Sequence, residues 1–160
     1  MIVTLCMNGS HRITLGTNLL VRSVDVTAGP RYRLAIDIVR AAARADCVLT
    51  LQAISEFFSA VTRKRLMVRD RAAALATHWL HVFPHTSGSV DAVRAALADA
   101  TAGRAAYWDA LLVATAAEAD CSVALTEDLQ HGSTLHGVEI HNPFDLAGGL
   151  TARARVLLGL

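Results

Sequence analysis

The chain has 160 residues, a length that predicts one domain with a core large enough to fold alone. Hydrophobic residues make up 53% and charged residues 18%, a balance that argues against a disordered protein. The net charge of +1 argues against a protein that binds nucleic acid through bulk positive charge. An enzyme that acts on nucleic acid is not excluded, because the negative charge of an acidic active site can cancel the positive charge of a basic rim in the total.

The three cysteines, Cys6, Cys47 and Cys121, are odd in number and far apart, and no C-x-x-C pair occurs. This pattern supports neither a disulfide framework nor a cysteine zinc site, and it favours a reducing cytoplasm. No apolar run approaches the roughly 20 residues that a membrane-spanning helix needs. The N-terminal residues also lack the basic region of a signal peptide.

The order of apolar runs along the chain predicts short strands that alternate with helices. We interpret residues 1–11 as an N-terminal extension, 12–146 as the main domain, and 147–160 as a C-terminal tail or helix. The patterns predict, in order, a strand at 12–15, helices at 19–24 and 31–44, a strand at 47–51, helices at 52–66 and 69–80, an extended segment at 81–85, helices at 89–100 and 104–119, and strands at 121–125 and 138–140. This alternation predicts a three-layer α/β/α domain around a short parallel sheet of four or five strands. Ligands of such sheets bind beyond the carboxyl ends of the strands.

Three acidic residues occupy positions near that edge. Asp109 shares a helix face with apolar Leu112 and Val113, where a carboxylate is costly unless it is paired or bound to a metal. A plain alternative is that Asp109 only offsets the helix dipole. Glu56 can equally be a solvated helix residue, and Asp128, which follows a strand end, can be a turn residue.

Together these three carboxylates point to metal chemistry. Several carboxylates at one sheet edge repel each other unless a cation joins them. Oxygen ligands suit Mg²⁺ or Mn²⁺, and such ions activate water in phosphodiester cleavage. Glu56, Asp109 and Asp128 are therefore the expected metal ligands and catalytic residues, with Mg²⁺ or Mn²⁺ as the expected cofactor.

Five short segments also resemble the motifs of a known family in their order and spacing. They are residues 15–20 (LGTNLL), 54–57 (ISEF), 107–111 (YWDAL), 125–132 (LTEDLQHG) and 142–144 (NPF). The family is the PIN-domain ribonucleases, in particular the VapC-like toxins of type II toxin–antitoxin pairs. The resemblance runs from about residue 12 to residue 144, nearly the whole domain.

The resemblance implies a metal-dependent endoribonuclease with an acidic quartet, an RNA substrate, a cognate antitoxin and a homodimer. Glu56, Asp109 and Asp128 match three positions of the quartet, and Gly16 stands at the fourth. The chain is then either a natural degenerate or an inactivated form of an active enzyme, and we favour the second. Thr17, Asn18 and Thr126 would lie beside the site, although turn capping explains Asn18 and Thr126 at least as well.

Two other classes of function stay open. A non-catalytic PIN-fold module that binds RNA or a protein is consistent with Gly16, and a metal-free α/β domain for a small molecule would need no carboxylate cluster. The histidines show no metal-binding spacing, and we expect exposure for His131. One cluster of basic residues stands out, and we interpret it as a solvated helix end in preference to an RNA contact. It consists of Arg63, Lys64, Arg65, Arg69 and Arg71.

Overall fold

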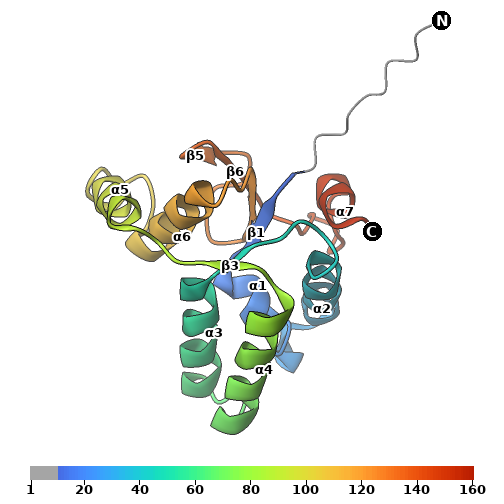
Figure 1. Cartoon of the computed structure of the whole chain (residues 1–160). Coiled ribbons are helices and arrows are strands. Elements are labelled where there is room, and N and C mark those ends of the chain that lie inside the picture. Colours follow the sequence, from blue (N-terminus) through green and yellow to red (C-terminus); the bar gives the residue numbers. More distant parts are fainter. Residues whose placement is uncertain (1–10) are drawn as a thin grey trace, which may run out of the picture.

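The computed structural model describes residues 11–160 and shows an α/β protein built on two small sheets (Figure 1). The main sheet has the strand order β1-β4-β6-β5, and the second sheet pairs two parallel strands, β2 and β3. The strands are β1 (Ile13–Leu15), β2 (Leu49–Thr50), β3 (His85–Thr86), β4 (Val123–Leu125), β5 (Thr134–Leu135) and β6 (Val138–His141). Strands β1, β4 and β6 are parallel, whereas β5 runs antiparallel to β6.

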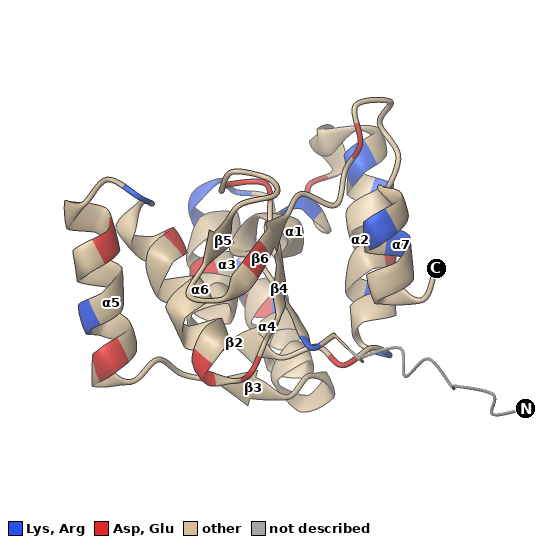
Figure 2. Ribbon diagram, turned by 90° about the horizontal axis from the view of Figure 1, so that it is seen from above, with Lys and Arg blue, Asp and Glu red and all other residues tan. Residues whose placement is uncertain are grey.

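Helices cover both faces of the main sheet. They are α1 (Thr17–Arg22), α2 (Pro30–Ala42), α3 (Leu51–Arg63), α4 (Arg69–Val82), α5 (Val90–Thr101), α6 (Tyr107–Glu118) and α7 (Ala152–Leu158), with a 3₁₀ turn at Val26–Ala28. The view from above places α5 and α6 on one side of the sheet and α2 and α7 on the other (Figure 2). This arrangement confirms the expected three-layer α/β/α class, and α3 and α4 form a further helical pair (Figure 1).

Local sequence explains where these elements begin. The β1 and β4 strands are short apolar runs in which every residue is buried. Thr50, Ser89 and Thr151 cap α3, α5 and α7, because each side-chain oxygen accepts a hydrogen bond from a backbone N–H of the first helical turn. Pro30 opens α2, where its fixed φ suits the first helical position and its missing N–H has no partner to lose.

Several predicted boundaries were wrong for identifiable reasons. The strand expected at 47–51 is reduced to two residues, because Thr50 already serves as the cap of α3. Of the extended segment expected at 81–85, His81 and Val82 are instead the end of α4, whereas Phe83 is extended and leads through Pro84 into β3 at His85. Strand β5 was not predicted. It is two residues long and joins β6 through a turn in which His136 and Gly137 both have positive φ.

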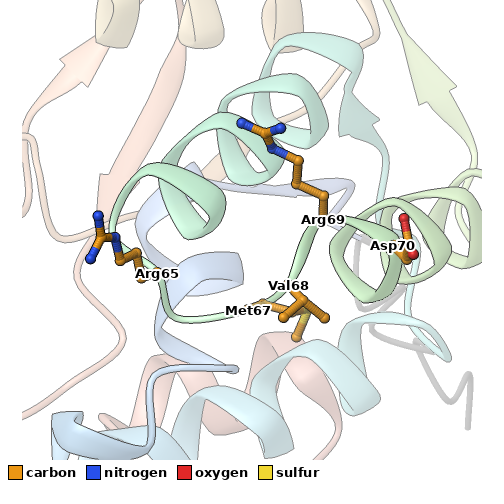
Figure 3. Close-up of a pocket in the computed structure, with 5 residues that line it drawn as sticks. All are labelled: Arg65, Met67, Val68, Arg69 and Asp70. Atoms are coloured by element: carbon orange, nitrogen blue, oxygen red, sulfur yellow. The ribbon is translucent and has the colours of Figure 1, made fainter.

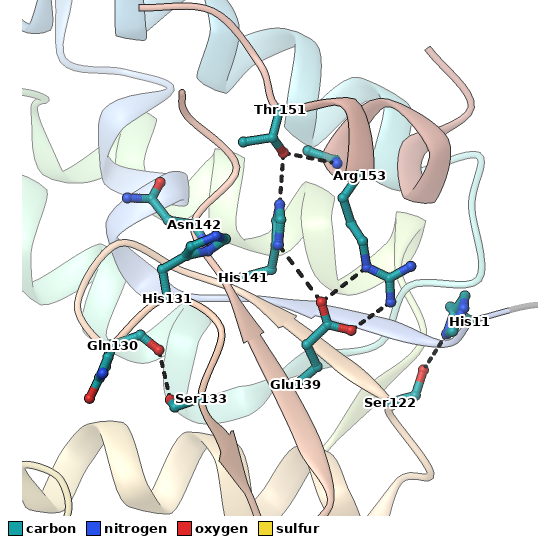
Figure 4. A network of polar contacts seen from close by, with 11 residues as sticks. His11, Ser122, Gln130, His131, Ser133, Glu139, His141, Asn142, Thr151 and Arg153 are labelled. Atoms are coloured by element: carbon teal, nitrogen blue, oxygen red, sulfur yellow. Dashed lines mark hydrogen bonds and ion pairs between the residues drawn. The ribbon is translucent and has the colours of Figure 1, made fainter. Parts of the chain in front are cut away.

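The C-terminal segment is tied to strand β6 by polar contacts (Figure 4). His141 Nε2 and Thr151 Oγ1 are joined by a 2.7 Å hydrogen bond, and Thr151 caps α7. Arg153 donates two hydrogen bonds to the Glu139 carboxylate, at 3.0 and 2.5 Å. Because Leu157 and Leu158 are buried in the main core, α7 packs as part of the domain.

Two cysteines are described, and both are buried with free thiols. Burial raises the pKa of Cys47 well above its ordinary value and that of Cys121 to about 11. Both thiols therefore stay protonated and unreactive at neutral pH. Cys6, like most of the predicted N-terminal extension, lies outside the described residues. Among residues 11–160, no helix is long and apolar enough to cross a membrane.

Candidate active site

The three predicted carboxylates come from three different elements. Glu56 lies on α3, Asp109 in the first turn of α6, and Asp128 in the loop after β4. All three line one small cavity of about 40 Å³, together with Gly16, Thr17, Trp108, Leu112, Thr126 and Leu129. The cavity sits beyond the carboxyl ends of β1 and β4, which are paired in parallel with Leu15 opposite Leu125. Parallel pairing is the reason that segments so distant in sequence meet at one edge.

Asp109 has the most perturbed environment of the three. Burial first, and then the charges of Asp128 and Glu56, raise its pKa to about 6. The helix face explains the burial, because Leu112 and Val113, one turn further along α6, are both in the core. The raised pKa of Asp109 therefore reflects, in part, repulsion from the other two carboxylates. A cation bound between them would relieve that repulsion.

Glu56 is held by a neighbour that sequence reasoning missed. Gln52, one turn earlier on α3, donates from Nε2 to Glu56 Oε1 at 2.6 Å and to the carbonyl oxygen of Trp108 at 2.7 Å. One amide therefore ties the α3 carboxylate to the start of α6. Among the described residues Glu56 forms no ion pair with Arg63, so its partner is an uncharged donor.

Thr126 organises the loop that carries Asp128. Its Oγ1 accepts hydrogen bonds from Asn18 Nδ2 at 3.0 Å and from the Asp128 N–H at 3.2 Å. Asn18 and Thr126 thus do cap this turn, and they also link α1 to the acidic loop. The neighbouring Glu127 is held away from the cavity lining by ion pairs with Arg22 and Arg31, both at 2.7 Å. Asp128 is therefore the acid of this loop that reaches the cavity.

Gly16 lines the carboxylate cavity at a position where the neighbouring Thr126 leaves no room for a side chain. Its φ of −68° and ψ of 152° suit any residue, so conformational freedom does not require glycine here. A Cβ at this position would lie 2.8 Å from Thr126 Oγ1 and 2.9 Å from Thr126 Cβ. These distances are about 1 Å shorter than ordinary contacts. The ends of β1 and β4 therefore approach each other as closely as they do only without a side chain at residue 16.

The donor set fits a hard divalent cation in its chemistry. Three carboxylates face one cavity, and Thr17 Oγ1 and Asn18 Oδ1 nearby are buried oxygens without a hydrogen-bond partner. Within residues 11–160, however, no three acidic, histidine or cysteine side chains stand close enough together to hold one ion as they are placed. The set therefore fits an ion that keeps several of its waters, as Mg²⁺ does, and does not form a closed cage.

A second cavity adjoins the first. It has a volume of about 350 Å³ and shares Thr17, Glu56 and Asp128 with the carboxylate cavity. Arg22, Asp25 and Lys64 line it as well, on the side of α1 and the end of α3. The carboxylate cavity thus adjoins a second one with two basic side chains and one further carboxylate, and Arg22 is already paired with Glu127.

The other residues considered from sequence lie elsewhere. His131 is exposed, as expected, and accepts a hydrogen bond from the Asn142 N–H while its ring packs edge-on against His141 (Figure 4). A separate hollow of about 500 Å³ lies at the turn between α3 and α4. Figure 3 shows the guanidinium groups of Arg65 and Arg69 at opposite ends of this turn. Of the basic cluster, Lys64 is the residue that lines the cavity beside the carboxylates.

Comparison with solved structures identifies the fold. No protein-family model matches the chain, and no curated protein matches it. Among solved structures it resembles VapC20 of Mycobacterium tuberculosis, a Sarcin-Ricin loop cleaving toxin, with a TM-score of 0.53, 16% identity, and coverage of 72% of this chain and 89% of that one. It also resembles VapBC2 of Rickettsia felis bound to a promoter DNA fragment, with a TM-score of 0.58, 12% identity, and coverage of 81% and 97%. The chain therefore has the PIN-like fold of VapC structures, as the motifs predicted.

Proposed function

We propose that this chain is a metal-dependent endoribonuclease of the toxin type, with Glu56, Asp109 and Asp128 as its catalytic residues. The observation that carries the proposal is the cavity that these three carboxylates line, where burial, and then the charges of Asp128 and Glu56, raise the pKa of Asp109 to about 6. Such a cluster destabilises a fold, so its retention at a ligand-binding sheet edge favours a functional role. The shared fold with a toxin that cleaves the Sarcin-Ricin loop supports RNA as the substrate.

The same three carboxylates are the proposed ligands of Mg²⁺ or Mn²⁺. When bound, the ion would neutralise phosphate charge and activate water for hydrolysis of the phosphodiester. Gln52 orients Glu56 toward the cavity, and Thr126 fixes the backbone of Asp128 through the Asp128 N–H. Burial and the charges of Asp128 and Glu56 raise the pKa of Asp109 to about 6, and an ion bound at the site would stabilise its charged form.

Gly16 weakens the proposed metal site. It removes one anionic oxygen from a site in which few protein ligands hold the ion, so the affinity for Mg²⁺ should be low. Thr126 also approaches residue 16 so closely that a side chain there would require Thr126 to move. We accordingly propose weak activity for this chain, with the fold intact.

The remaining parts of the proposal concern partners. A cognate antitoxin is supported by the likeness to VapBC2, which was solved with DNA from its own promoter. A homodimer, supported by the toxin resemblance, and a cytoplasmic location, supported by the scattered cysteines, complete the proposal.

A second function is favoured by a specific observation. Without a carboxylate at residue 16, and with no three ligating groups converging among residues 11–160, the chain can also be a non-catalytic PIN-fold module that binds RNA or a protein. Such a module would keep the shape of the site and lose its metal chemistry.

Cleavage of a structured RNA by the purified chain separates the two functions. The assay compares the unaltered chain with Glu56→Gln and Asp128→Asn, and with Glu118→Gln as a control at the far end of α6. The ribonuclease proposal predicts slow cleavage that requires Mg²⁺ or Mn²⁺, is lost in the two site variants and survives in the control. Absence of cleavage at any metal concentration would contradict it and favour the non-catalytic module.

A further inference from the structure

Trp108 is an exposed aromatic side chain at the rim of the carboxylate cavity. It lies next to Asp109 in the first turn of α6, lines the cavity, and is 59% exposed. The other tryptophan, Trp79, is buried against Phe57, with the two ring centroids 4.6 Å apart. A single exposed apolar side chain is ordinary by itself, so it is the place of Trp108 in the lining of the carboxylate cavity that gives its exposure significance.

The position of Trp108 is set by its neighbours. Its carbonyl oxygen accepts a hydrogen bond from Gln52, the residue that also holds Glu56. Tyr107 meets the indole edge-on, with ring centroids 5.0 Å apart and planes at 67°. An edge-on neighbour supports the ring and leaves a π-face uncovered by Tyr107. The indole is therefore anchored beside the carboxylates and available for stacking.

A basic residue stands on the opposite side of the carboxylates. Lys64, at the end of α3, lines the second cavity and forms no ion pair with any residue that the structure describes. Arg22 lines the same cavity, but Glu127 already pairs with it. The two cavities share Glu56 and Asp128, and Trp108 lines the first whereas Lys64, together with Asp25, lines the second.

We propose that Trp108 stacks on an unpaired base of the RNA while Lys64 contacts a backbone phosphate on the other side of the carboxylates. Stacking on aromatic rings together with cations along the backbone is how proteins hold single strands, because every base offers a π-face. A base inside a duplex is stacked on its neighbours and cannot meet the ring, so the site would select single-stranded segments. This inference rests on the proposed function for its substrate. It adds that the protein binds an unpaired base and a backbone phosphate of that substrate.

Intrinsic fluorescence gives a direct test, because Trp79 and Trp108 are the only tryptophans in the sequence. The probe is a short single-stranded RNA, titrated in EDTA so that no divalent ion is available for hydrolysis. A duplex of the same sequence is the comparison. We expect the single strand to quench the emission of Trp108 and the duplex to quench it far less. Trp108→Phe removes the quenching but keeps an aromatic ring, so its affinity for a labelled probe should stay near that of the unaltered chain.

The variants make the proposal quantitative. Loss of one base stack predicts that Trp108→Ala weakens binding by about 5- to 150-fold. Leu97→Ala, which removes another exposed apolar side chain from α5, should leave binding unchanged. Lys64→Ala should lower the slope of log affinity against log salt by roughly 0.7, the value for one phosphate contact on a single strand. Arg71→Ala, from the same basic cluster but outside the cavity lining, should not change that slope.

The results separate this inference from the proposed function, since binding is measured without metal and without cleavage. Equal affinities for Trp108→Ala and the unaltered chain, or equal quenching by duplex and single strand, would overturn the inference even if the chain cleaves RNA. Binding that depends on Trp108 in a chain that cleaves nothing would support the inference while the ribonuclease proposal fails.

Discussion

Gly16 offers the most informative perturbation, because two substitutions there separate space from charge. Gly16→Ala adds only the Cβ, which would meet Thr126 Oγ1 at 2.8 Å and Thr126 Cβ at 2.9 Å. Thr126 cannot turn away freely, since its Oγ1 holds Asn18 and the Asp128 N–H. Overpacking of this kind costs about 1–3 kcal/mol of unfolding free energy. For a domain of this size, each kcal/mol lowers the melting temperature by roughly 2–4 °C.

Gly16→Asp adds the same Cβ and a carboxylate. In EDTA we expect this variant to be less stable than Gly16→Ala, because a fourth negative charge joins Glu56, Asp109 and Asp128. In Mg²⁺ the order should reverse. An ion present at 100 times its dissociation constant stabilises the folded state by about 2.7 kcal/mol. The predicted signature is therefore a crossover between the two variants as metal is added.

The measurement is thermal or urea unfolding of the three proteins in EDTA and in Mg²⁺. If Gly16→Ala is as stable as the unaltered chain, the argument from the close approach of Thr126 is refuted. If Mg²⁺ changes the stability of the Asp and Ala variants equally, residue 16 is not a ligand position. A Gly16→Asp protein that is stable and cleaves RNA rapidly would identify the glycine chain as the inactivated form of an active enzyme.

Asp109→Asn should raise the unfolding free energy at pH 7.5 by about 1–2 kcal/mol after allowance for solvent screening. The pKa of Asp109 is about 6 when folded, above its ordinary 3.8, so this gain should fade as the pH drops from 6 to 4, and a gain that persists at pH 4 would contradict the assignment. Gln52→Ala should cut the cleavage rate more than it cuts stability, measured by single-turnover kinetics and urea unfolding, because Glu56 loses its orienting donor; an unchanged rate would contradict that role. Asp99→Asn should cost about 2–3 kcal/mol at pH 7 in urea unfolding, since buried Asp99 accepts hydrogen bonds from Arg104 at 2.7 Å and shares one with His136 at 2.6 Å. Burial acts to raise the pKa of Asp99, but these two partners lower it, so its contribution should be present above pH 4 and disappear in acid, and a cost that stays constant through that range would contradict the assignment.

Much of the fold was predictable because local signals were strong. The apolar runs of β1 and β4 and the periodicity of α2 and α3 identify themselves in sequence. The antiparallel β5 was not predictable, because two residues carry no alternation and its pairing depends on the turn at His136 and Gly137. The end of α4 was missed because His81, Val82 and Phe83 have the alternation of a strand, whereas the helix continues to Val82 and ends there because Pro84 disfavours helical backbone at Phe83.

The candidate site divides in the same way. Asp109 stood out in sequence because a carboxylate on an apolar helix face is energetically costly unless it is paired or bound to a metal. Gln52 and Trp108 carried no such signal, since their roles depend on the distance between α3 and α6. The contact between Gly16 and Thr126 depends on how closely β1 and β4 approach, which no spacing of residues encodes.

The central claim, that Glu56, Asp109 and Asp128 form one metal site, is tested most directly by titration of Mn²⁺ followed by electron paramagnetic resonance. The titration compares the unaltered chain with Asp109→Asn at pH 7.5 and repeats the unaltered chain at pH 5, where a carboxyl group with a pKa of about 6 is mostly protonated. The account predicts one weakly bound Mn²⁺ per chain at pH 7.5, weaker binding at pH 5, and no binding by Asp109→Asn. Equal binding by the unaltered chain and Asp109→Asn at pH 7.5 would contradict it.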